Sequence, residues 1–131
     1  MGNDTTEGTR SVAASYLASF ASGDPAAVAA HVTDDFSNQH TSALGSPSHG
    51  KEAYLERLAE FLATFSGLTY ETTDIVAEGD RAAAAYVMRA RVDGTPIEIQ
   101  GIMRLTIRDG LIDRRVDYFD SLTFLRQTGQ A

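Results

Sequence analysis

The sequence predicts a single α+β domain in which three N-terminal helices pack against one face of a strongly curved, mainly antiparallel sheet. Two observations support this prediction. In the first half of the chain, apolar residues recur about every four positions, as on the buried stripe of an amphipathic helix. From about residue 68 onward they alternate with polar residues over successive segments separated by glycine-containing turns, which is typical of hairpin-connected strands. Helices that precede a run of strands favour the α+β class.

The size and charge of the chain limit its class of function. It has 131 residues, the usual length of one domain, and no cysteine, which excludes disulfides, thiolate zinc sites and cysteine nucleophiles. Its 18 acidic and 11 basic residues give a formal net charge of −7, which disfavours nucleic acid as a partner. No apolar run approaches the ~20 residues of a membrane span, and no secretory signal is visible. We therefore expect a cytoplasmic protein without a membrane partner.

The first helix is expected over about residues 9–21, where Tyr16 and Phe20 continue an apolar stripe with a spacing of four. Residues 1–8 are polar, and we expect them to form a disordered tail. The folded domain is therefore expected to span residues 9–128.

Two further helices are expected before the sheet. Asp24 and Pro25 are a typical N-cap and first-turn pair, which predicts a short second helix that ends near residue 32. Residues 36–50 are rich in Gly, Ser and His and are interpreted as a loop whose first residues form a short edge strand. Ser48 is expected to cap a third helix that runs to about residue 66.

Four strands complete the predicted domain. They are expected over about residues 68–77, 82–92, 95–108 and 111–120. The last two connections each contain an Asp-Gly pair, which is the strongest short signal for a β-hairpin. The sheet is therefore predicted to be an antiparallel meander at its C-terminal end.

The hairpin positions predict which side chains share a face. Pairing across the turn at residues 93–94 sets Tyr86 opposite Gly101, on a face that is almost wholly apolar and is expected to be the core or cavity side. The same construction across residues 109–110 sets Asp117 opposite Ile102, on the outer face. One β-bulge would reverse that result, so the strand pattern leaves the face of Asp117 open.

The last strand places chemically active side chains close together. Asp113, Arg115, Asp117 and Phe119 alternate along one face of it. An ionised carboxylate beside apolar residues is costly unless it is paired. Asp117 is therefore either a functional acid, the partner of Arg115 in a buried salt bridge, or an exposed carboxylate at the rim.

Histidine and tyrosine supply the other candidates. His40 lies in the predicted loop and is a candidate general base because imidazole exchanges a proton near neutral pH, although a solvated loop histidine is the alternative. Tyr16 is a candidate hydroxyl donor on an otherwise apolar stripe, and a core tyrosine is its alternative. His31 and His49 are interpreted as structural or solvated.

The order of the helices, the Gly23-Asp24 pair between the first two, and the VDYFD ending of the last strand resemble the nuclear transport factor 2-like superfamily. Within it the chain is most similar to the SnoaL-like polyketide cyclases and ketosteroid isomerases, and it shares the sequence DYFD with limonene epoxide hydrolase. The resemblance covers about residues 9–128. It implies a cystatin-like cone, also described as an α+β barrel, that opens at one end on a hydrophobic pocket.

The resemblance also implies roles for individual residues. Tyr16 falls where ketosteroid isomerases place the tyrosine that donates to the developing oxyanion. His40 falls on their general base and on the polar, water-holding residue of the epoxide hydrolase. Asp117 falls on the last-strand acid that the cyclases and the epoxide hydrolase share, which favours an inward placement.

Three positions depart from these patterns. Met103 stands where the isomerases have a second oxyanion donor. Met88 and Ala90 stand near the strand Arg and Asp of the epoxide hydrolase. Neither activity therefore transfers intact to this chain.

The leading hypothesis from the sequence is a cofactor-independent proton-transfer enzyme of isomerase or polyketide-cyclase type. Its substrate would be a small apolar molecule with a carbonyl group, with His40, Asp117 and Tyr16 as catalytic residues. We expect no cofactor and no metal, because the three histidines lack ligand spacing. The residues expected to line the pocket are Phe20, Tyr54, Phe61, Phe65, Tyr86, Met88, Met103 and Phe119.

Two alternatives remain open at this point. One is a non-catalytic ligand-binding or dimerisation module that uses the same pocket, and the other is an epoxide-hydrolase-like enzyme with an altered triad. In each case the outer sheet face, with Val87, Ile102, Val116 and Tyr118, is expected to form a homodimer.

Overall fold

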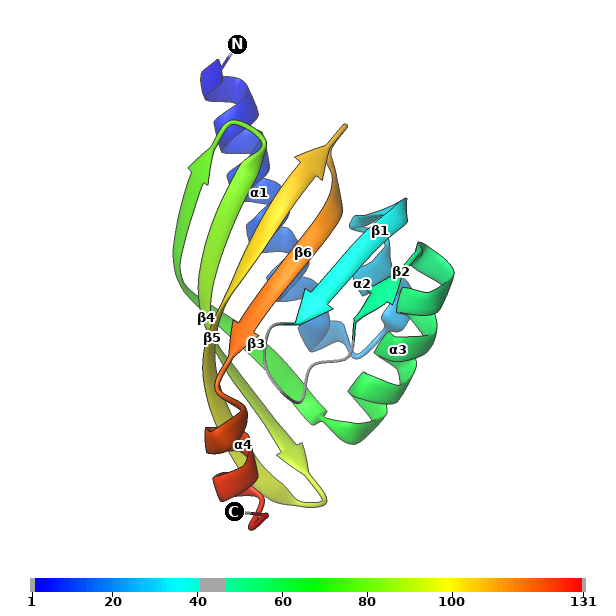
Figure 1. Ribbon diagram of the computed structural model, residues 1–131, viewed down its shortest axis with the longest axis vertical. Coiled ribbons are helices and arrows are strands. Elements are labelled where there is room, and N and C mark those ends of the chain that lie inside the picture. Colours follow the sequence, from blue (N-terminus) through cyan, green and yellow to red (C-terminus); the bar gives the residue numbers. More distant parts are fainter. Residues whose placement is uncertain (1, 41–46, 131) are drawn as a thin grey trace.

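The computed structural model describes residues 2–40 and 47–130, and over these residues the chain has the predicted α+β fold (Figure 1). The elements are α1 (Gly2–Ser19), the 3-10 turn η1 (Phe20–Ser22), α2 (Pro25–Ala29), β1 (Val32–His40), β2 (Ser48–His49), α3 (Lys51–Thr64), β3 (Ser66–Glu78), β4 (Arg81–Val92), β5 (Thr95–Arg108), β6 (Leu111–Phe119) and α4 (Ser121–Gln127). No helix in this described part is long and apolar enough to cross a membrane.

The described strands form one mixed, curled sheet of six strands in the order β2-β1-β6-β5-β4-β3. All neighbours are antiparallel except β1 and β6, which run parallel. Helix α1 packs along one face of this sheet, mainly against β3 and β4, and α3 packs beside β1 (Figure 1). The core between these layers is built from large side chains with almost no solvent exposure, among them Tyr16, Phe20, Phe36 and Met103.

Helix α1 begins at Gly2 and so includes the segment that was expected to be a disordered tail. The side-chain hydroxyl of Thr9 donates to the carbonyl of Gly79 over 2.6 Å, and the amide of Gly79 donates to the hydroxyl of Thr6 over 3.1 Å. These bonds tie the start of the helix to the turn between β3 and β4. The polar composition of residues 1–8 favoured a disordered tail, because composition alone does not predict these tertiary hydrogen bonds.

Strand β1 corrects the interpretation of residues 36–50 as a loop with an edge strand. It starts at Val32, and it lies between β2 and β6 instead of at an edge. Its inward positions from Phe36 onward are Phe36, Asn38 and His40, so two of the three are polar. That composition is not typical of a buried strand. Residues 41–46 of the predicted loop lie outside the described residues.

The start of α3 and the presence of α4 also differ from the prediction. Ser48 belongs to β2, paired with Asn38, and Gly50 is the residue that precedes α3. Helix α4 was not predicted. Its N-cap is Asp120, whose carboxylate accepts from the amide of Thr123 over 3.1 Å, so the spacing of Asp120 and Thr123 was the available signal.

The meander β3 to β6 was predicted to within two residues at each end, and its register explains the placement of Asp117. Tyr86 pairs with Gly101, as expected. Between β5 and β6 the register shifts, because Asp113 is an extra residue in β6 with no partner opposite it. Asp117 therefore pairs with Met103 on the inner face. The sequence left open whether a β-bulge reverses the face of Asp117, and the structure has such a bulge between β5 and β6.

Candidate functional site

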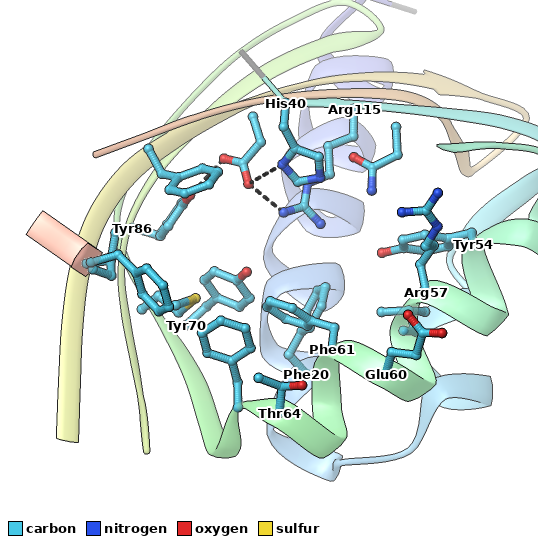
Figure 2. A pocket seen from close by; sticks show the side chains of 18 residues that line it. Phe20, His40, Tyr54, Arg57, Glu60, Phe61, Thr64, Tyr70, Tyr86 and Arg115 are labelled. Atoms are coloured by element: carbon cyan, nitrogen blue, oxygen red, sulfur yellow. Dashed lines mark hydrogen bonds and ion pairs between the residues drawn. The ribbon is translucent and has the colours of Figure 1, made fainter. Parts of the chain in front are cut away.

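The inner face of the sheet, α3 and α4 enclose a cavity of about 350 Å³ (Figure 2). Aromatic and aliphatic side chains form most of its wall. Four polar side chains, Asn38, His40, Arg115 and Asp117, form the polar end of the cavity, and Arg57, Glu60 and Thr64 of α3 are polar residues of another part of the wall (Figure 2). The lining residues are Phe20, Asn38, His40, Tyr54, Arg57, Leu58, Glu60, Phe61, Thr64, Phe65, Tyr70, Tyr86, Met88, Ile99, Arg115, Asp117, Phe119 and Phe124. A concave site with few convergent polar groups is the usual form of a small-molecule site.

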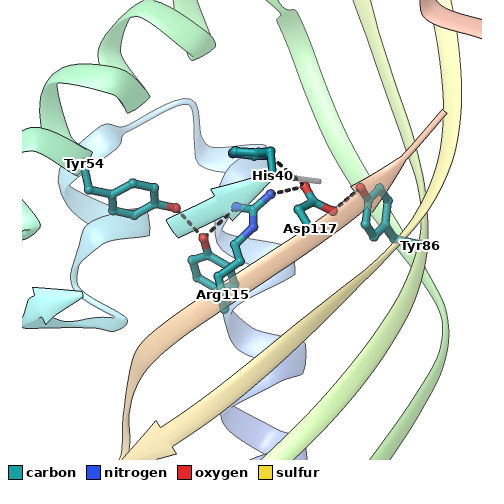
Figure 3. Close-up of polar contacts among 6 residues, drawn as sticks. His40, Tyr54, Tyr86, Arg115 and Asp117 are labelled. Atoms are coloured by element: carbon teal, nitrogen blue, oxygen red, sulfur yellow. Dashed lines mark hydrogen bonds and ion pairs between the residues drawn. The ribbon is translucent and has the colours of Figure 1, made fainter. Parts of the chain in front are cut away.

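Asp117 is at the centre of the polar end (Figure 3). Its Oδ2 accepts a hydrogen bond from Nη2 of Arg115 over 2.7 Å, and its Oδ1 accepts one from the hydroxyl of Tyr86 over 2.7 Å. Asp117 and Arg115 are 3% and 4% exposed. The carboxylate is thus paired and hydrogen-bonded, which offsets the cost of burying it.

His40 reaches the same carboxylate from the neighbouring strand. It pairs with Asp117 in the parallel register of β1 and β6, and its Nδ1 lies 3.7 Å from Oδ2 of Asp117. Burial lowers the pKa of His40 to about 4. The positive charge of Arg115 acts in the same direction, and the negative charge of Asp117 partly opposes it. The imidazole is therefore neutral at pH 7 and can accept a proton.

Arg115 extends the network to two tyrosines. Its Nη1 donates to the hydroxyl oxygen of Tyr16 over 2.8 Å, and the hydroxyls of Tyr16 and Tyr54 are hydrogen-bonded to each other (Figure 3). Burial alone would lower the pKa of Arg115, but its contacts with Tyr16 and Asp117 outweigh burial and hold that pKa above its ordinary value. The guanidinium therefore stays charged and neutralises Asp117.

A close backbone approach positions Tyr86. The Cβ of an alanine at position 101 would lie 2.5 Å from Cζ of Tyr86 and 2.7 Å from the carbonyl oxygen of Tyr118. Only glycine leaves room there for the Tyr86 ring to cross the neighbouring strand and reach Asp117. Burial raises the pKa of Tyr86 and the charge of Asp117 raises it further, so Tyr86 stays a phenol that donates.

Asn38 is a further polar side chain at this end of the cavity. It lies two residues before His40 on β1, is 5% exposed and lines the cavity. Its Oδ1 has no hydrogen-bond partner among the described residues. Buried amide oxygens are rarely left unpaired, so a donor on a bound molecule suits this position.

Most of the residues that the sequence predicted for the site come together around the cavity. His40 and Asp117 meet at its polar end. Tyr16 and Met103 have no solvent exposure and are not among the lining residues. Tyr16 is instead hydrogen-bonded to Arg115 and Tyr54. The other predicted residues that line the cavity are Phe20, Tyr54, Phe61, Phe65, Tyr86, Met88 and Phe119.

Sequence reasoning missed Asn38 and the role of Arg115 as the hub of the network. The alternation along β6 did place Arg115 on the face of Asp117, so a signal was present for it. Tyr70 and Phe124 were also missed. His31, in contrast, is a structural residue whose ring lies within hydrogen-bond distance of backbone carbonyls of α2.

Metal ligands do not cluster in the part of the chain that the structure describes. Among residues 2–40 and 47–130 there is no group of three or more His, Asp or Glu side chains placed to hold an ion. The chemistry that this arrangement supplies comes from a neutral imidazole, phenol hydroxyls and a buried ion pair. Such groups move protons and bind oxygen atoms.

Comparison with known proteins supports the fold. A family model described as the SnoaL-like domain matches residues 13–115. A protein from Catenulispora acidiphila, described as having a ketosteroid isomerase-like fold and solved with trimethylamine, gives a TM-score of 0.84 at 20% identity, covering 92% of this chain and 93% of that chain. PrhC from Penicillium brasilianum gives a TM-score of 0.85 at 19% identity, covering 96% and 89% of the two chains.

A further similar structure is an LEH-like epoxide hydrolase from M. tuberculosis, with a TM-score of 0.80, 19% identity and coverage of 95% of this chain and 90% of that chain. At such identities the likeness shows the fold alone. A search of curated proteins gives no significant match.

Proposed function

This chain belongs to the SnoaL-like domain family, and we propose that it is a cofactor-independent enzyme that moves a proton on a small, mostly apolar carbonyl compound. The observation that carries the proposal is the placement of His40, with Nδ1 3.7 Å from Asp117, at the polar end of a largely aromatic cavity. A base, a carboxylate close enough to stabilise its protonated form, and hydroxyl donors at one end of an apolar site are the groups that enolisation needs.

His40 is the proposed base. The tautomer with its proton on Nδ1 faces Asp117, which leaves the lone pair of Nε2 to accept a proton from the carbon next to the carbonyl. The imidazolium formed in this step is stabilised by the Asp117 carboxylate. The same base then returns the proton to another carbon in an isomerisation. In an aldol-type cyclisation the enolate carbon instead attacks a second carbonyl carbon, and the alkoxide that forms takes the proton back from His40.

The weak basicity of His40 favours an activated carbon acid as substrate. A base with a pKa of about 4 removes a proton faster when the C–H bond is more acidic, because the proton transfer is then less unfavourable. A carbon between two carbonyl groups meets this requirement better than the carbon beside a single ketone. Poly-β-ketone substrates are therefore favoured over simple ketones.

The test is deuterium uptake from D2O, measured by mass spectrometry, with a 3-ketosteroid, a cyclic 1,3-diketone and an aromatic poly-β-ketone as substrates. We expect catalysed uptake with wild-type protein, its loss in His40→Ala, and a large decrease in Asp117→Asn. The matched controls are His49→Ala and Asp74→Asn, which change exposed residues of the same types. Equal rates in wild type and His40→Ala would refute the proposed mechanism.

A second candidate function is binding of a small molecule without reaction. It is favoured by the contacts of Asp117, whose two oxygens already accept from Arg115 and Tyr86, as in a purely structural buried ion pair. In that case ligands from the same panel would raise the melting temperature, and no deuterium uptake would be catalysed. Epoxide opening is less favoured, because Met88 and Ala90 supply no acid or base on β4.

A further inference from the structure

We propose that Tyr54, and not Tyr16, is the hydroxyl group that donates a hydrogen bond to the carbonyl oxygen of the bound molecule. This inference rests on the function proposed above and assigns one role within the same cavity. It reverses the expectation from the sequence, which made Tyr16 the donor. The two phenols are hydrogen-bonded to each other, so the question is which of them keeps a proton for the ligand.

Arg115 sets the direction of the hydrogen bonds. A guanidinium group donates and never accepts. Its Nη1 lies 2.8 Å from the hydroxyl oxygen of Tyr16, so that oxygen accepts one hydrogen bond from Arg115. The proton of Tyr16 must then point elsewhere.

Two arrangements remain for the bond between the phenols. If Tyr54 donated to Tyr16, the proton of Tyr16 would have no acceptor, because among the described residues its hydroxyl is hydrogen-bonded to Arg115 and Tyr54 alone and Tyr16 has 0% exposure. A buried donor without an acceptor is strongly disfavoured. Tyr16 therefore donates to the oxygen of Tyr54, and Tyr54 keeps its own proton.

The position of Tyr54 gives that proton a target. Tyr54 projects from α3 and lines the cavity (Figures 2 and 3). Tyr16 is not among the residues that line it. The chain Arg115–Tyr16–Tyr54 also polarises the last hydroxyl, because hydrogen bonds in series strengthen one another. Burial holds the pKa of Tyr54 well above its ordinary value, so the group remains a phenol. The proton of Tyr86, in contrast, is already donated to Asp117.

The experiment uses 2-acetonaphthone with a ¹³C-labelled carbonyl as the probe, and the infrared frequency of that carbonyl as the readout. We expect a lower frequency in the wild-type protein than in a hydrocarbon solvent, because a hydrogen bond weakens the C=O bond. In Tyr54→Phe the frequency should return toward the hydrocarbon value, with about fivefold to tenfold weaker binding from the loss of one hydrogen bond. Tyr16→Phe should keep most of the shift.

Tyr70→Phe tests the competing donor, because Tyr70 is another tyrosine of the cavity wall and also interacts with Arg115. The proposal is overturned if Tyr16→Phe or Tyr70→Phe abolishes the shift while Tyr54→Phe retains it. If Tyr54→Phe does not fold, 3-fluorotyrosine at position 54 replaces it. This phenol is more acidic, so a further decrease in frequency is expected, and an unchanged frequency would also overturn the proposal.

The test of Tyr54 and the test of the proposed function can fail independently of each other. His40→Ala is expected to abolish deuterium uptake and to leave the carbonyl shift in place, because Tyr54 is hydrogen-bonded through Tyr16 and Arg115. A retained shift without any catalysed uptake in the wild-type protein would refute the proposed enzyme and leave the assignment of Tyr54 standing. If the wild-type protein catalyses deuterium uptake but the carbonyl shift does not depend on Tyr54, the assignment of Tyr54 is refuted and the proposed enzyme is left standing.

Discussion

The buried pair of Arg115 and Asp117 determines the polar end of the cavity. Both side chains are almost without solvent exposure and lie two residues apart on β6, where Nη2 and Oδ2 are 2.7 Å apart. Removing either charge leaves the other buried without its main partner. Such single removals are among the costliest substitutions in proteins.

Arg115→Met is therefore expected to lower the free energy of unfolding by about 3–5 kcal/mol, measured by urea denaturation. The double variant Arg115→Met, Asp117→Leu should recover a large part of this loss, because it removes both charges. Arg89→Met is the control, since Arg89 pairs with Glu71 and Glu98 on the exposed side of the sheet and its loss should change stability little. A small effect of Arg115→Met would contradict the described network.

His40 gives the protein a defined response to acid. Because its pKa is lowered from 6.5 to about 4, the unfolded chain binds a proton at this site more readily than the folded protein does. The contribution of His40 to stability is therefore fully present above about pH 6.5 and decreases as the pH falls toward 4. Catalysed deuterium uptake should fall over the lower part of this range, as the base becomes protonated.

The measurement for this prediction is the NMR titration of the His40 ring in the folded protein. We expect a midpoint near pH 4, and His40→Gln should weaken the loss of stability between pH 6.5 and 4. A midpoint near 6.5 would mean that the ring is solvated, and a midpoint above 6.5 would mean that Asp117 outweighs burial and Arg115; either result would contradict the prediction.

The residues of the candidate site were only partly predictable from the sequence. A carboxylate in an otherwise apolar face stands out in a sequence, which is why Asp117 was found, and a loop-like histidine stands out for the same reason. The direction of a hydrogen bond does not appear in a sequence. Tyr16 was therefore expected to be the ligand donor, whereas Arg115 occupies its oxygen.

The register of the hairpin formed by β5 and β6 determines whether Asp117 faces the cavity. The extra residue Asp113 turns the following residues of β6 by one position, so that Asp117 faces inward. The carboxylate of Asp113 accepts a hydrogen bond from the hydroxyl of Thr106 on β5. The position of such a bulge depends on this cross-strand contact, which explains why alternation alone left the face of Asp117 open.

The crossing of the Tyr86 ring over β5 can be tested by a substitution at Gly101. Gly101→Ala is expected to displace the Tyr86 ring, to break its hydrogen bond to Asp117, and to cost about 1–3 kcal/mol in the free energy of unfolding. Gly8→Ala is the control, because nothing lies within 4 Å of the added methyl group and alanine favours a helix. An unchanged urea midpoint for Gly101→Ala would contradict the close approach.

Strand β1 shows where element prediction fails. Its inward residues Asn38 and His40 are polar because they face the cavity, so the usual apolar alternation of a half-buried strand is absent. Strands β3 to β6 have that alternation and were predicted closely. A site built on a strand therefore hides the strand from pattern analysis.

For the whole molecule, the change of period from about four to two was sufficient to predict the α+β class. The mixed character of the sheet was not predictable in the same way, because β1 pairs in parallel with the last described strand, far along the chain. Such a contact depends on the packing of the complete fold.

The outer face of the sheet leads to a prediction about assembly. Ile102 and Tyr118 are 47% and 39% exposed on adjacent strands, with Val87 and Val116 on the same face. We expect a homodimer through this face, detected by sedimentation velocity at micromolar concentration. Ile102→Glu should produce monomers, whereas Leu122→Glu, which changes an equally exposed residue on α4, should not. A monomeric wild-type protein would contradict the prediction.

The most direct test of the account is a crystal structure of the protein with a cyclic 1,3-diketone bound in the cavity. We predict that Nε2 of His40 lies about 3–3.5 Å from the carbon between the two carbonyl groups, with one carbonyl oxygen hydrogen-bonded to Tyr54. A diketone bound with that carbon out of reach of His40, or a His40 ring turned away from Asp117, would contradict the proposed proton transfer.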